Sequence, residues 1–160
     1  MSKKEIFPGR YTAGQNGEVV VFIIGMRINK FTAVHKWWPV FTAMPPMMKE
    51  LSANKELGCL SMESFFGLRT TLLVQYWRSS EDLLSYAKGQ KHLKAWENFN
   101  KKIGNNDSVG IYHETYIVPQ GNYETLYGNM TKFGLSNAIG HKSITEHINN
   151  AQKRFKEQAY

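Results

Sequence analysis

The chain has 160 residues, of which 42% are hydrophobic and 21% charged, a composition typical of a folded globular domain and not of a disordered segment. The net charge of +7 is spread along the chain, and close groups of cations occur only at 3–4, 101–102 and 153–156, which argues against a nucleic-acid-binding surface. A single cysteine, Cys59, excludes an intramolecular disulfide, and neither a signal peptide nor an apolar run long enough to span a bilayer is recognised. We therefore expect one cytoplasmic domain over residues 1–160 with no nucleic-acid and no membrane partner.

The first part of the chain predicts an arm, a strand and a helix. Residues 1–17 contain several turn-forming glycines and a proline, so they are expected to form an N-terminal arm with turns. Residues 18–26 are an almost continuous run of apolar and β-branched side chains, which predicts a central strand covered on both faces. From Thr32, apolar residues recur at spacings of three and four and predict a helix. Pro45 and Pro46 are expected to end or kink it, and Pro46 to start a second short helix.

Two strands and a helical region follow. The segments 59–66 and 70–77 predict strands, and the short link 67–69 predicts a hairpin turn between them. Ser79 or Ser80 can cap the next helix. After a weak point at Gly89, one helical face is formed by His92, Ala95, Trp96, Phe99 and Ile103.

The last part of the chain predicts a fourth strand and a tail. The strand is expected at 109–118, and the order strand, helix, strand, strand, helix, strand is that of a ferredoxin-like α+β domain with helices on one face of an antiparallel sheet. Residues 119–160 are expected to form a helical tail, with a possible extra strand at 123–130 and a final helix that starts at Ser143. Because the helices leave the other sheet face bare, we expect a homodimer.

Two histidines are the main candidate site residues. His92 shares its helical face with aromatic residues, and His113 lies in the middle of the fourth strand, where the alternation predicts a mostly apolar layer and a neutral imidazole able to move a proton. An imidazole among apolar neighbours needs a partner, and one natural partner is a metal. The alternative is that both are structural histidines of the core.

Two further features have a functional and a plain interpretation. Met44, Met47 and Met48 either line a flat hydrophobic ligand or are ordinary core. Arg27 follows the central strand, where it either meets a carboxylate of a ligand or forms a surface ion pair.

Several segments in order resemble a family of small bacterial and fungal proteins that is described as monooxygenase-like and was long labelled a domain of unknown function. The segments are 20–30 (VVFIIGMRINK), 75–79 (QYWRS), 92–96 (HLKAW), 113–116 (HETY) and 123–130. The resemblance covers nearly the whole chain. It implies a dimeric α/β-barrel fold and leaves the substrate open.

A more distant resemblance concerns chemistry. His92-Leu93 and Tyr112-His113-Glu114 are similar in type, order and approximate spacing to segments of the heme-containing aldoxime dehydratases, in which a His-Leu supplies the axial iron ligand and a Tyr-His-Glu supplies a distal histidine. The resemblance implies that His92 is the iron ligand and His113 the catalytic distal acid–base, with Ser79 as a second distal candidate. Trp96 and Phe99 would then wall the heme, and Arg27 would meet a propionate.

These observations predict a heme-binding small enzyme, monooxygenase-like or aldoxime-dehydratase-like, that acts on a small apolar organic substrate. Two alternatives remain open. One is a cofactor-independent monooxygenase of the same fold, in which His113 deprotonates the substrate. The other is a non-catalytic protein that binds heme or another ligand.

Overall fold

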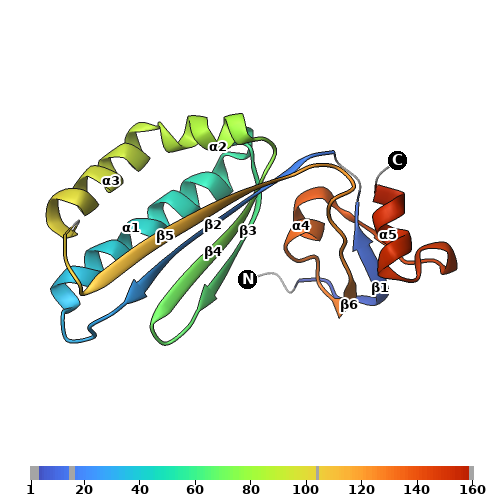
Figure 1. The fold of residues 1–160 in the computed structure, drawn as a ribbon, viewed down its shortest axis with the longest axis horizontal. Helices are drawn as coiled ribbons and strands as arrows, with labels where there is room; N and C mark the ends of the chain where they lie inside the picture. The colour runs from blue at the N-terminus through green and yellow to red at the C-terminus, as the bar shows by residue number, and fades with distance from the viewer. Residues whose placement is uncertain (1–3, 15–16, 104, 159–160) are drawn as a thin grey trace.

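A four-stranded antiparallel sheet with three helices on one side forms the main body of the protein (Figure 1). The computed structural model describes residues 4–14, 17–103 and 105–158. The strands run in the order β3-β4-β2-β5, with β2 at Val19–Ile28, β3 at Cys59–Phe66, β4 at Thr70–Trp77 and β5 at Val109–Val118. The helices are α1 (Val34–Ala53), α2 (Ser80–Ala87) and α3 (Gln90–Ile103), and a 3-10 turn lies at Lys55–Leu57. This order and connectivity confirm the predicted ferredoxin-like α+β fold.

The central strand β2 explains where the core lies. It pairs with β4 and with β5 along its length, so alternate residues face opposite sides of the sheet. Val20 faces the helices and is buried together with Trp77 of β4 and Leu51 of α1. Val19 faces the other side and is buried by the tail. The continuous apolar run therefore marks a strand that is covered on both faces at this end, as the sequence predicted.

Helix α1 is longer than expected, because it continues through Pro45 and Pro46 to Ala53. The prediction that these prolines end the helix and start a second one is wrong. A proline removes one backbone hydrogen bond, but tertiary packing can hold a helix together across that loss. Here Met44 before the prolines and Leu51 after them both pack on the interior side of α1.

A second, three-stranded sheet was not expected. It has the order β6-β1-β7, with β1 at Phe7–Ala13, β6 at Tyr127–Met130 and β7 at His141–Ser143. The described part of the N-terminal arm is thus largely a strand, and the extra strand expected within 123–130 is shorter than that segment. The final helix α5 covers Ala151–Gln158 and does not start at Ser143, because residues 141–143 pair with β1.

The tail packs on one end of the sheet face that the helices leave free (Figure 1). It also contains α4 (Leu135–Ile139) and a 3-10 turn at Glu146–Ile148. Ser61 on β3 donates a hydrogen bond to the carbonyl of Gly134 at 3.0 Å, and Glu63 accepts one from the amide of Gly134 at 3.1 Å. Beyond the tail, Tyr112 and Tyr116 on this face are exposed. One chain therefore forms an open sheet, and closure of a barrel by a second copy stays a prediction.

Candidate functional site

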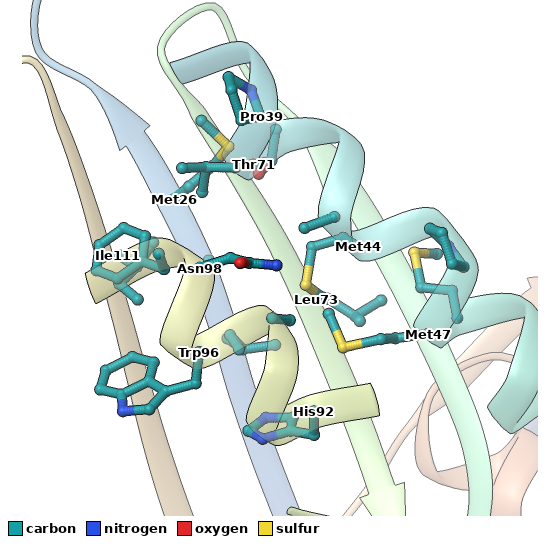
Figure 2. Close-up of a pocket in the computed structure, with 18 of the residues that line it drawn as sticks. Met26, Pro39, Met44, Met47, Thr71, Leu73, His92, Trp96, Asn98 and Ile111 are labelled. Carbon is teal, nitrogen blue, oxygen red and sulfur yellow. The ribbon is translucent and has the colours of Figure 1, made fainter. Parts of the chain in front are cut away.

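A groove of about 470 Å³ lies between α1 and α3, with the helix-facing side of the sheet as its floor (Figure 2). Most of its lining is apolar: Val40, Met44, Met47 and Met48 from α1, Ile24, Met26, Leu73 and Ile111 from the sheet, and Ala95, Trp96 and Phe99 from α3. Pockets of this size and character are typical of sites for small organic ligands.

The three methionines favour the functional interpretation over plain core. Met44, Met47 and Met48 all line the groove, where their flexible thioether side chains can follow the shape of an apolar ligand. On the opposite wall, Trp96 and Phe99 are stacked with ring centroids 5.8 Å apart. The walls are thus built from adaptable sulfur side chains on one helix and aromatic rings on the other.

His92 stands at one end of the groove, and Met26, Pro39 and Thr71 stand at the other (Figure 2). Among the described residues that line the groove, His92 is the only imidazole. The predicted face of α3 therefore brings His92, Trp96 and Phe99 into one cavity, as the sequence indicated.

Behind His92 lies a second, more polar recess of about 420 Å³. Its lining includes the carboxylates of Glu50, Glu56 and Asp82 and the ring of Tyr86, whose centroid is 6.2 Å from that of His92. Tyr86 donates a hydrogen bond to Glu50 at 3.5 Å. Burial, followed by the nearby Glu50 charge, raises the pKa of Tyr86 to about 12, so this phenol stays protonated at neutral pH. His92 thus separates an apolar groove from an acidic recess.

Asn98 is a groove residue that sequence reasoning missed. Its side chain projects from α3 into the groove (Figure 2). The available signal was its position three residues after Ala95, which places it on the side of α3 that approaches α1. Besides His92 and Lys94, the groove lining obtains its side-chain hydrogen-bonding groups from Asn98, Ser64 and Thr71.

His113 is not in the groove, and the burial predicted for it from its apolar neighbours is wrong. It pairs in register with Ile24 and lies 5.7 Å from the ring of Phe22, so it is on the helix-facing side of the sheet, but its side chain is exposed. The reason is that β5 is an edge strand, and residues 112–117 are all exposed. The alternation of side chains along β5 predicted the correct sheet face for His113, but it could not show whether another element covers that face.

Arg27 and Ser79 also lie outside the groove lining. Arg27 is exposed and alternates with the groove residue Met26, so it points to the opposite face of the sheet. Ser79 is the N-cap of α2 and accepts a hydrogen bond from the amide of Asp82 at 3.2 Å. The cap function predicted for Ser79 is confirmed, and its predicted catalytic role has no support from its position.

The residues around the groove fit a heme. The described residues contain no group of three or more His, Cys, Asp or Glu side chains that could hold a metal ion. A porphyrin brings four nitrogen ligands of its own and needs from the protein one axial donor and apolar walls. His92 and the walls of the groove meet that requirement, and the acidic recess offers acceptors for the second nitrogen of His92.

Comparison with known proteins places this fold in a family. Residues 19–135 match the model of the Monooxygenase af470-like family. Monooxygenase af470 of Aspergillus fumigatus is 28% identical over an alignment of 130 residues that covers 71% of this chain and 43% of that protein. The chain thus spans less than half the length of this curated relative.

Two solved structures of aldoxime dehydratases share the fold. One was crystallised with butyraldoxime and superposes with a TM-score of 0.63 at 13% sequence identity. This superposition covers 88% of the present chain and 43% of the dehydratase chain. The other has a TM-score of 0.50 at 11% identity over 86% of this chain and 44% of its own. At such identities the likeness shows the fold alone. The family match covers more than half of the sequence, and the chain therefore belongs to the Monooxygenase af470-like family.

Proposed function

We propose that the chain is a small oxidoreductase or lyase that binds an apolar organic substrate in the groove between α1 and α3. The observation that carries this proposal is a largely apolar cavity of about 470 Å³ with a single imidazole, His92, in its described lining. The name of the family supports monooxygenation as the reaction class. The hydrogen-bonding groups of Asn98 and Thr71 would orient one polar group of the substrate.

Heme is the cofactor that we propose for this site. His92 would be the axial ligand, and Trp96, Phe99 and the methionines of α1 would shield the porphyrin from water. Lys94 lines the groove and, in place of Arg27, would be the cation that meets a heme propionate. When bound, the heme would supply a redox-active iron. The protein would contribute orientation, exclusion of water and an acceptor for the second His92 nitrogen from the acidic recess.

A cofactor-independent monooxygenase is the second candidate, because the groove itself contains a base. His92 would accept a proton from a substrate C–H group, the amide of Asn98 would stabilise the charge on an adjacent oxygen, and the resulting carbanion would pass electrons to dioxygen. The proton-transfer role of His113 stays a prediction, and it requires that another element cover the exposed edge strand.

Hemin titration followed by absorption spectroscopy separates the two candidates. We expect a shifted Soret band for the wild type and for His113→Ala, and loss of that band for His92→Ala, because the apolar groove alone lacks the axial bond. His35→Ala, at an exposed histidine of α1, is the matched control. A wild type without a Soret shift contradicts heme binding, and a shift that survives His92→Ala contradicts the ligand assignment.

Occupancy of the groove can be tested without heme. Ala95→Trp places a large ring inside the groove, whereas Ala53→Trp places the same ring at an exposed position at the end of α1. We expect an apolar fluorescent probe such as anilinonaphthalene sulfonate to bind the wild type and Ala53→Trp and to bind Ala95→Trp much more weakly. Equal binding to all three would show that the groove is not the ligand site.

A further inference from the structure

The end of the sheet where β2 ends and β3 turns into β4 carries exposed apolar side chains beside cations. We call residues 27–34 and 65–69 the basic tip; they include the loop from β2 to α1 and the turn from β3 to β4 (Figure 1). The two parts are joined directly, because the amide of Ile28 donates to the carbonyl of Arg69 at 2.7 Å and the guanidinium of Arg69 lies 4.4 Å from the ring centre of Phe31.

The apolar side chains of the basic tip are unusually accessible. Leu68 at the turn is 87% exposed and Phe66 is 70% exposed, and Phe31, Val34 and Phe65 are exposed as well. Single exposed apolar residues are common on protein surfaces, but a group of them generally marks a site of interaction. The most exposed member, Leu68, is at the point of a hairpin turn and not in a hollow, which fits insertion into a soft layer better than contact with a flat protein surface.

The charges of the basic tip all have one sign. Arg27, Lys30 and Arg69 are exposed, and neither of its two segments contains Asp or Glu. Asp107, from the loop before β5, pairs with Lys30, so Arg27 and Arg69 carry the remaining positive charge. The net charge of +7 for the chain adds long-range attraction toward an anionic surface.

We propose that the basic tip docks on an anionic phospholipid surface, with Leu68 and Phe66 in the interfacial layer and Arg27 and Arg69 at the headgroups. Apolar side chains that enter the interface together with cations that meet anionic lipids are the physical basis of peripheral binding. No described helix has both the length and the apolar character to cross a bilayer. The sequence-based expectation of no membrane partner rested on the lack of a spanning segment, and it does not apply to contact of this kind.

The docked surface would adjoin the groove, because Phe66 belongs both to the basic tip and to the groove lining. An apolar substrate dissolved in the lipid could then enter the groove without crossing water. This last step rests on the proposed function. The docking itself does not, since it needs only the side chains of the basic tip.

Co-sedimentation with vesicles tests the docking. The vesicles are phosphatidylcholine alone or phosphatidylcholine with phosphatidylglycerol, at low and at physiological salt. We expect binding to the anionic vesicles that weakens with salt. Leu68→Asp should weaken binding to the anionic vesicles about tenfold or more, because an inserted leucine is replaced by a charge. Arg27→Gln should weaken that binding about fivefold, which corresponds to the loss of one cation at the surface. Leu126→Asp is the matched control, since Leu126 is an exposed leucine of the tail.

Three outcomes would overturn the proposal. They are no binding of the wild type to the anionic vesicles, wild-type binding by Leu68→Asp, and a loss in Leu126→Asp as large as that in Leu68→Asp. A wild-type circular dichroism spectrum for each variant excludes unfolding as the cause. Because none of these measurements involves hemin or a groove ligand, failure of the docking and failure of the proposed function are separate results.

Discussion

Replacement of Ser79 by alanine tests whether this residue is a helix cap or a catalytic group. Ser79→Ala removes the acceptor for the amide of Asp82, which lies 3.2 Å from the Ser79 hydroxyl at the start of α2. That amide is one of the four at a helix N-terminus without a partner inside the helix. The variant should therefore lose stability, with the groove unchanged, because Ser79 does not line it.

The expected loss follows from the geometry of the cap. Replacing a serine N-cap by alanine typically costs about 1 kcal/mol, within a range of about 0.5–2 kcal/mol. The distance of 3.2 Å is at the long end of normal hydrogen bonds, so we expect about 1 kcal/mol or slightly less. For a chain of this size, that loss lowers Tm by about 2–4 °C.

Thermal unfolding followed by circular dichroism measures this shift. Ser79→Thr keeps a hydroxyl at the cap and should recover most of the stability. Ser52→Ala, at an exposed serine of α1, should change Tm little. A wild-type Tm for Ser79→Ala would refute the cap reasoning, and loss of hemin binding or turnover in both Ser79 variants would restore the catalytic assignment.

Three further predictions concern the tail, the pH dependence of stability and the assembly. Glu124→Gln leaves the buried guanidinium of Arg154 without its carboxylate and should lower the free energy of urea unfolding by about 3 kcal/mol. The double replacement Glu124→Leu with Arg154→Met should recover most of that loss. Equal stability of Glu124→Gln and the wild type would show that the ion pair does not hold the tail. Burial, followed by the charge of Lys132, lowers the pKa of His141, so the folded state disfavours the imidazolium. The stability that His141 contributes should therefore be fully present above the unfolded-state pKa of about 6.5 and fall as the pH drops toward the lower folded-state pKa. The urea midpoints at about pH 5 and pH 8 should differ less in His141→Phe than in the wild type. An unchanged difference would show that His141 does not cause the pH dependence. Light scattering should report about twice 18.4 kDa if the exposed sheet face of Tyr112 and Tyr116 is covered by a second copy, and a monomer would remove both the homodimer and the dimeric barrel.

Local patterns were sufficient for most of the main sheet. The strands at 59–66 and 70–77 were predicted with the bounds that the structure has, and the face of α3 with His92, Trp96 and Phe99 followed from helical spacing alone. Such features repeat with the period of the element itself, and a sequence displays that period directly. Where the pattern met prolines in α1, packing on the helix interior outweighed the local preference to stop.

Contacts between distant segments were not accessible in the same way. The β1 strand pairs with residues more than 110 positions later, so no local signal predicted the strand pairing of the three-stranded sheet. His113 was assigned to the correct face of its strand, but its exposure depends on β5 being at the edge of the sheet, where residues 112–117 are exposed.

The sequence by itself determined the ferredoxin-like order of elements, the one-sided placement of the helices and the shared face of His92 and its aromatic neighbours, because each depends on the period of side chains along one element. Only the tertiary structure decided that His92 borders an apolar groove on one side and an acidic recess on the other, and that His113, Arg27 and Ser79 lie outside that groove. The physical reason is that a cavity is defined by what several elements leave unfilled, and that space depends on how helices and sheet pack together and not on the pattern of any one of them.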